Sequence, residues 1–139
     1  MPEAPVSCVI DTSALVAMIL REPDSGVLVD AIGYFPLRIL PPSCIVEFCS
    51  LRRLELDLRS WLIQFIAEFE VNILPMDDRV GWIAATAAMR YGRGSGHPAK
   101  LNFGDCMSYA FARHLEAPLL FKGDDFAHTD VIPAHTVLP

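Results

Sequence analysis

The sequence lacks a long apolar run and shows no spacing typical of a zinc site. Its longest apolar run, residues 14–20, is far shorter than the ~20 residues that a membrane-spanning helix needs. The four cysteines form no CxxC pair and lie in apolar stretches, so we expect buried, reduced side chains. The four histidines also lack ligand spacing. Residues 1–5 carry no positive charge, unlike the start of a signal peptide. We therefore expect a cytoplasmic protein without a membrane partner.

The chain is also short of positive charge. It has 11 lysines and arginines against 17 acids, a formal net charge of −6. Binding to phosphate backbones favours basic surfaces, so this balance argues at first against a nucleic-acid partner. If four acids are held in one metal pocket, however, the rest of the chain is almost neutral. Local basic patches then remain compatible with the sequence. One candidate patch consists of Arg90, Arg93 and Lys100, which lie in or beside the glycine-rich loop 92–100. A solvated connector is an equally good interpretation of that loop.

The 139 residues are enough for one domain with a real core, and we expect a single domain over residues 1–139. Short apolar runs rich in β-branched residues predict strands at 6–10, 37–40, 71–74 and 119–122, and an edge strand at 136–138. Helical periodicity predicts helices between them, beginning near Ala14, Asp24, Ser43, Asp77 and Asn102. This alternation predicts an α/β/α sandwich around a central parallel sheet of about four to five strands.

An aromatic stripe covers residues 51–69, where apolar side chains recur at helical spacing. We expect two consecutive helices there, with a break near residues 55–57. Such a stripe is more often core than a binding face. The high apolar content of the chain, 53%, also fits a surface that a partner covers.

Two acids stand where either a helix cap or a functional carboxylate is expected. Asp11 ends the first predicted strand, and ligands of open parallel sheets bind at that edge. Because Thr12 and Ser13 can also cap the next helix, we favour a functional role for Asp11. Asp105 lies three residues after Asn102, a spacing typical of a capped helix start. For Asp105 the local sequence leaves capping and function open.

For three further acids the sequence also leaves a structural and a functional role open. Glu47 lies among apolar neighbours in a predicted helix, where an unpaired charge is costly. Pairing with Arg52 or Arg53, or a solvent-facing position, explains Glu47 equally well. Asp124 and Asp125 follow the last predicted strand, and they have an alternative role in capping a short turn.

These acids meet if the fold is as expected. Crossovers of one hand leave the carboxyl ends of parallel strands at one edge, so we expect Asp11, Asp124 and the start of the Asp105 helix there. Glu47 then points in from its own helix. Clustered carboxylates raise one another's pKa unless a cation balances their charge. Oxygen ligands favour Mg²⁺ or Mn²⁺, ions that activate water and neutralise phosphate charge. The predicted reaction is hydrolysis of a phosphodiester bond.

Four short motifs of the chain occur together in one known family. They are Asp11-Thr12-Ser13-Ala14-Leu15, Glu47 in its apolar helix, the segment LNFGDC at 101–106, and LLFKGDDF at 119–126 followed by Thr129-Asp130. With these motifs the chain resembles a PIN-domain protein, specifically a VapC-type toxin of a toxin–antitoxin pair. The resemblance implies a Mg²⁺- or Mn²⁺-dependent endoribonuclease acting on RNA, usually a homodimer, whose active site is covered by a VapB-type antitoxin.

The resemblance also assigns residues. The implied catalytic and metal-binding acids are Asp11, Glu47, Asp105 and Asp124. Asp124 is preferred over the adjacent Asp125, and the hydroxyl of Ser13 or Thr12 matches a group that steadies the site. The alternative function is a non-catalytic PIN-like module that binds RNA or a protein without cutting.

Overall fold

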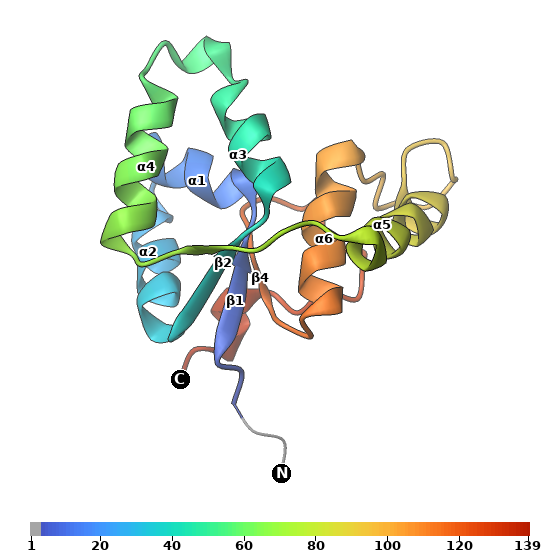
Figure 1. Ribbon diagram of the computed structural model, residues 1–139. Coiled ribbons are helices and arrows are strands. Elements are labelled where there is room, and N and C mark those ends of the chain that lie inside the picture. Colours follow the sequence, from blue (N-terminus) through green and yellow to red (C-terminus); the bar gives the residue numbers. More distant parts are fainter. Residues whose placement is uncertain (1–3) are drawn as a thin grey trace.

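The computed structural model describes residues 4–139, so the first three residues considered above for a signal peptide lie outside it. The elements, in order, are β1 (Ser7–Ile10), α1 (Thr12–Ile19), α2 (Ser25–Tyr34), β2 (Leu37–Leu40), α3 (Pro42–Cys49), η1 (Arg52–Leu54), α4 (Leu58–Glu68), β3 (Asn72–Ile73), α5 (Asp78–Tyr91), α6 (Phe103–His114), β4 (Leu119–Leu120) and η2 (Ala134–Val137) (Figure 1). Within residues 4–139, every helix is too short or too polar to cross a bilayer.

The four strands form one parallel sheet in the order β3-β2-β1-β4. Ser7 pairs with Leu37 and Val9 with Leu119, which places β1 at the centre. Helices cover both faces of the sheet, so the predicted α/β/α sandwich is confirmed (Figure 1). The predicted edge strand at 136–138 is wrong. The chain forms the 3₁₀ helix η2 there, and only Pro133 makes an isolated bridge, to Leu119.

Four of the α-helices in residues 4–139 begin at a side-chain cap, and the sequence predicts two of these caps, Asp77 and Asn102. Asp11, Asp57, Asp77 and Asn102 each accept a hydrogen bond from a backbone N–H in the first turn. Two predicted caps differ. Asp24 occupies the cap position of α2 without a side-chain hydrogen bond, and Ser43 lies inside α3. Helix α3 begins earlier because Pro42 has no N–H and fits the first helical position.

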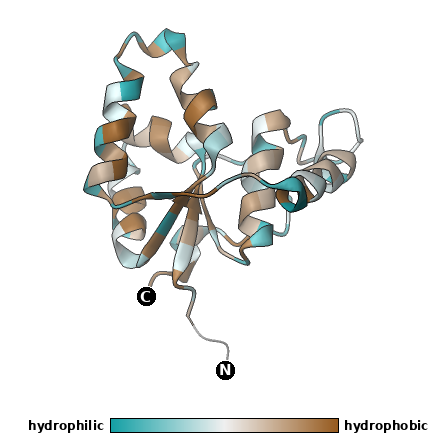
Figure 2. Cartoon of the chain, in the orientation of Figure 1, coloured by the Kyte–Doolittle hydropathy of each residue, from teal (hydrophilic) through white to brown (hydrophobic). Residues whose placement is uncertain are grey.

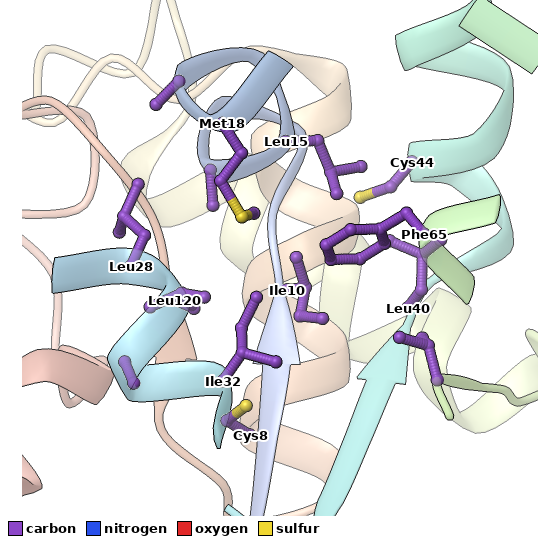
Figure 3. Close-up of a cluster of buried hydrophobic side chains, with 14 of the residues drawn as sticks. Cys8, Ile10, Leu15, Met18, Leu28, Ile32, Leu40, Cys44, Phe65 and Leu120 are labelled. Atoms are coloured by element: carbon purple, nitrogen blue, oxygen red, sulfur yellow. The ribbon is translucent and has the colours of Figure 1, made fainter. Parts of the chain in front are cut away.

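The core has one cluster on each side of the sheet. Along β1, Cys8 and Ile10 belong to the cluster under α1–α4, while Val9 belongs to the cluster under α5 and α6. Figure 3 shows the first cluster around Ile10, and Figure 2 shows the hydrophobic strands in the middle of the fold. Three of the cysteines are buried as expected, but Cys49 is exposed.

The aromatic stripe belongs mainly to the core. After η1 the chain is non-helical at residues 55–57, where the break was expected, and Asp57 then caps α4. Leu58, Leu62 and Phe65 are buried, and the Trp61 ring stacks on Phe65 with centroids 5.3 Å apart. The stripe therefore fixes α4 against the first cluster.

Candidate metal centre

A cavity of about 400 Å³ lies at the carboxyl edge of the sheet. It collects side chains from the residue after β1, from α1, α3, η1 and the start of α6, and from the segment after β4. Its polar lining residues are Asp11, Thr12, Ser13, Glu22, Glu47, Arg53, Asn102, Asp105, Lys122 and Asp125. The fold therefore brings Asp11, Glu47 and Asp105 together, as the sequence predicts, across nearly a hundred residues.

Asp11 is both a helix cap and a member of the cavity. Its Oδ2 accepts hydrogen bonds from the Ser13 N–H at 3.0 Å and the Ser13 hydroxyl at 2.6 Å. Its Oδ1 accepts a third from the Ser108 hydroxyl at 2.6 Å. A carboxylate has about four acceptor sites, so the one that remains is on Oδ1. Asp11 is only 3% exposed but lines the cavity, so a cation in the cavity can use that site.

Asp105 also combines the two roles that the sequence left open. Its Oδ2 accepts from the Asn102 N–H at 3.0 Å, while the Asn102 side chain accepts from the Asp105 N–H at 2.8 Å. This capping box fixes the first turn of α6. Burial raises the pKa of Asp105 to about 7, and the negative charges of Asp11 and Asp125 act in the same direction.

Glu47 reaches the cavity because a glycine faces it. A Cβ at Gly104 would lie 1.9 Å from Glu47 Oε2, so any other residue at 104 would displace this carboxylate from its present position. Burial raises the pKa of Glu47, and the charge of Asp11 adds to the effect. No ion pair joins Glu47 to Arg52 or Arg53 within residues 4–139, which removes the alternative based on pairing.

Cys44 is a neighbour that sequence reasoning assigned to the core alone. Ligand atoms of Asp11, Cys44 and Glu47 all lie within 4.8 Å of one another. The Cys44 Sγ is also 3.4 Å from the Ser108 hydroxyl. Because burial raises the pKa of the Cys44 thiol to about 12, it remains neutral at pH 7. Carboxylates therefore supply the negative charge of the cavity.

The structure distinguishes between the two adjacent acids after β4. Asp125 lines the cavity, and its negative charge helps to raise the pKa of Asp105. Asp124, the preferred residue at the sequence level, is not among the lining residues, although both acids are exposed. Gly123, with a φ of +98°, turns the chain just before the two acids.

These residues fit a divalent cation. The ammonium of Lys122 contacts Glu22 and Asp24, and within residues 4–139 no ion pair reaches Asp11, Glu47 or Asp105. The buried Thr12 hydroxyl lies beside Glu47 and Cys44 in the same site. Clustered acids without a protein cation, together with this hydroxyl, form an oxygen-rich site suited to Mg²⁺ or Mn²⁺.

Two contributors were missed by sequence reasoning. Ser108 is fully buried and connects α6 to Asp11. The sequence signal that could have identified Ser108 is a serine inside an otherwise apolar helix, because a buried hydroxyl needs a hydrogen-bond partner. Lys122 donates its backbone N–H to the Ser13 hydroxyl at 3.0 Å, which joins β4 to the first turn of α1. A backbone contact of this kind leaves no mark in the sequence.

Sequence comparisons place the chain among known proteins. Residues 8–132 match the model of the PIN domain family. Ribonuclease VapC42 of Mycobacterium tuberculosis (strain ATCC 25618 / H37Rv) is 39% identical over 130 residues, which cover 92% of this chain and 99% of VapC42. Ribonuclease VapC28 of the same strain is 39% identical over 125 residues, covering 88% and 94%.

Solved structures show the same fold. The Mycobacterium tuberculosis toxin VapC20, described as cleaving the sarcin–ricin loop, matches with a TM-score of 0.66 at 16% identity, over 91% of this chain and 99% of VapC20. A toxin–antitoxin complex from Klebsiella pneumoniae matches with a TM-score of 0.68 at 14% identity, over 91% and 97%. The chain belongs to the PIN-domain family and, within it, to the VapC ribonucleases.

Proposed function

We propose that this chain is a divalent-metal-dependent endoribonuclease that acts as the toxin of a toxin–antitoxin pair. The observation that carries the proposal is the buried carboxylate cluster at the carboxyl edge of the sheet, in a chain of the VapC family. Its site of action is the cytoplasm, where its RNA substrates are found.

Asp11, Glu47 and Asp105 are the proposed metal ligands. Asp125 is the fourth acid in our proposal, in place of Asp124, because Asp125 lines the cavity. The chemistry that Mg²⁺ or Mn²⁺ supplies when bound there is activation of water and neutralisation of phosphate charge. Asp11 and Asp105 are held in place by their cap hydrogen bonds, so the site is preorganised before RNA arrives.

Lys122 and Arg53 are the positive side chains that line the same cavity. Lys122 contacts Glu22 and Asp24, which hold its ammonium at the rim instead of against the metal ligands. We assign Lys122 and Arg53 to the substrate, since a phosphodiester needs cations beside a cluster of acids.

Cleavage of end-labelled total RNA by the purified chain tests this function. We expect cuts with added Mg²⁺ or Mn²⁺, and none with EDTA or with Asp105→Asn purified in parallel. Mapping the cuts would identify the RNA. A folded, metal-loaded protein that leaves all RNA intact would favour the alternative, a PIN-like binding module without catalysis.

The proposed partners are a VapB-type antitoxin and a second copy of the chain. Large apolar side chains that remain exposed support both, notably Val46 at 68% and Phe103 at 80%, which lie beside the acids on α3 and α6. Co-expression with a neighbouring gene that encodes a VapB-type antitoxin should raise the yield of soluble protein and suppress RNA cleavage. Sedimentation of the chain alone should give twice its mass of 15.4 kDa.

A further inference from the structure

A second cavity lies between α5 and α6, apart from the acids. It has a volume of about 660 Å³, and we call it the α5/α6 cleft. Its charged and aromatic lining residues include Asp78, Arg79, Trp82, Arg90, Tyr109 and Arg113. None of these lines the acidic cavity. Figure 1 shows α5 packed along α6, on the side of the sheet away from α4.

The cleft concentrates positive charge in an acidic protein. Three of the eleven lysines and arginines of the chain line it, against one lining acid, Asp78. The Arg90 guanidinium lies over the Tyr91 ring, 4.8 Å from its centroid, which orients it at the cleft. Arg113 lies 3.8 Å from Asp130, whose other oxygen accepts from the Tyr109 hydroxyl at 2.6 Å. That ion pair is largely exposed, so it holds Arg113 loosely.

An aromatic ring stands exposed among these arginines. Trp82 is 73% exposed, although an indole normally gains by burial. The core therefore does not explain its position on α5. An exposed indole beside guanidinium groups is the arrangement with which proteins bind single-stranded nucleic acid, since the ring stacks on a base and the cations contact phosphates.

We propose that the α5/α6 cleft binds an unpaired nucleotide of the RNA substrate, at a distance from the scissile phosphate. Trp82 stacks on the base, and Arg79 and Arg90 contact the flanking phosphates. Helix α6 connects the two sites, because Asp105 lies in its first turn and Arg113 in its last. Eight residues of helix separate them by roughly 12 Å, which a short single-stranded segment can span. The identity of the ligand as RNA rests on the proposed function.

An unpaired base is favoured over a duplex for a physical reason. Stacking on Trp82 requires a free π-face, which base pairing inside a helix does not provide. An acidic peptide would satisfy the arginines but would leave the exposed indole without a planar partner. We therefore expect the cleft to select single-stranded over double-stranded RNA.

Fluorescence anisotropy of a labelled single-stranded RNA 12-mer tests the inference. The assay uses Asp11→Asn with Mg²⁺, so that binding is read without cleavage. Trp82→Ala should weaken binding about tenfold, and Trp82→Phe should restore most of it. Arg79→Gln should weaken binding and reduce the slope of log affinity against log salt by about 0.7. The matched controls are Met89→Ala, exposed on α5 outside the cleft, and Arg59→Gln on α4.

The outcomes separate this inference from the proposed function. Equal RNA binding by Trp82→Ala, Arg79→Gln and the controls would overturn the cleft while leaving metal-dependent cleavage intact. Binding that depends on the cleft, with no metal-dependent cutting by the unmutated chain, would support the cleft and overturn the nuclease. Loss of affinity for a poly-glutamate peptide, with RNA affinity unchanged, would assign the cleft to an acidic protein segment and overturn our proposal.

Discussion

The acidic cavity and the α5/α6 cleft both lie beside α6, but they differ in charge, burial and origin. The acidic cavity gathers carboxylates from elements far apart in the sequence. Asp11 and Asp105 are buried and held by hydrogen bonds, and Glu47 lies against Gly104. The α5/α6 cleft uses exposed arginines and one exposed indole on two neighbouring helices. A buried cluster of like charges demands a counter-ion, whereas an exposed cationic surface attracts a polyanion without structural cost. In our proposal the first cavity performs the chemistry and the second holds the substrate.

The sharpest test of this division is Asp11→Asn. The change removes a ligand charge but little volume, so we expect the fold to persist and RNA cleavage to fall by more than about 100-fold, since loss of second-shell partners alone costs 10–100-fold. Binding of single-stranded RNA should not weaken. Cleavage rates and anisotropy on the same preparation measure both. If RNA binding disappears with cleavage, the two cavities are not separate in function.

Gly104→Ala should impair the acidic cavity without harming the fold. The new Cβ would overlap the Glu47 carboxylate, which is the mobile end of a side chain and can turn away. Cleavage should fall by about 100-fold and Mn²⁺ binding should weaken. The helix itself should gain up to about 1 kcal/mol, because alanine is the better helix former. Thermal unfolding and Mn²⁺ titration calorimetry measure these opposite effects.

Gly81→Ala is the matched control for this change. Gly81 also lies inside a helix, but an added Cβ there meets no atom within 4 Å. It should raise stability by a similar amount and leave cleavage and Mn²⁺ affinity unchanged. Equal activity of the two variants would mean that the position of Glu47 does not matter for catalysis.

The acidic cavity was largely predictable from sequence, and the comparison with the cleft explains why. Asp11, Glu47 and Asp105 are charges in apolar surroundings, which is a local signal that needs only a fold class to bring the residues together. The choice between Asp124 and Asp125 was not predictable, because two adjacent acids give the same local signal and only the folded chain shows that Asp125 lines the cavity. The capping and functional roles of Asp11 were not alternatives. Its Oδ2 caps α1 by accepting from the Ser13 N–H, while its Oδ1 accepts from Ser108 and keeps one acceptor site for a cation.

The cleft was not predictable in the same way. Surface arginines and a tryptophan on a helix have many ordinary explanations, and only tertiary packing shows that Arg79, Arg90 and Arg113 share one cavity. The sequence indicated a basic segment after α5, but it gave no reason to connect that segment with the last turn of α6. The final segment was misassigned for a similar reason, because a short apolar run fits a strand or a 3₁₀ turn equally well.

Ser108→Ala should have a smaller effect than the Gly104 change. It removes the hydroxyl that donates to Asp11 Oδ1 but leaves the two hydrogen bonds from Ser13. We expect cleavage and Mn²⁺ affinity to fall together by about tenfold, at the lower end of the range for groups that orient a ligand. Ser50→Ala is the control, since the Ser50 hydroxyl bonds only to the Val46 carbonyl. A normal Mn²⁺ affinity in Ser108→Ala would show that the Ser13 hydrogen bonds suffice to orient Asp11.

The smallest expected effect is on the pH dependence of stability in the metal-free protein. Because burial raises the pKa of Asp105 to about 7, the folded chain keeps a proton that the unfolded chain releases near pH 4. Between these values the folded state binds more protons, so the free energy of unfolding must decrease as pH rises. Asp105→Asn should abolish this contribution, and we expect its melting temperature to exceed that of the unmutated chain by a few degrees at pH 8 in EDTA but not at pH 4.5.

Added Mg²⁺ should reverse the order at pH 8. The ion binds the ionised carboxylate and so stabilises the unmutated chain, while Asp105→Asn lacks that charge and should gain much less. Thermal unfolding of both chains at both pH values, with EDTA and with Mg²⁺, measures all of these effects. Parallel pH profiles for the two chains in EDTA would mean that Asp105 does not carry the raised pKa, and would leave Glu47 as the acid whose pKa burial raises. The α5/α6 cleft gives an internal reference, since Arg79→Gln carries no titrating group in this range and should follow the unmutated chain throughout.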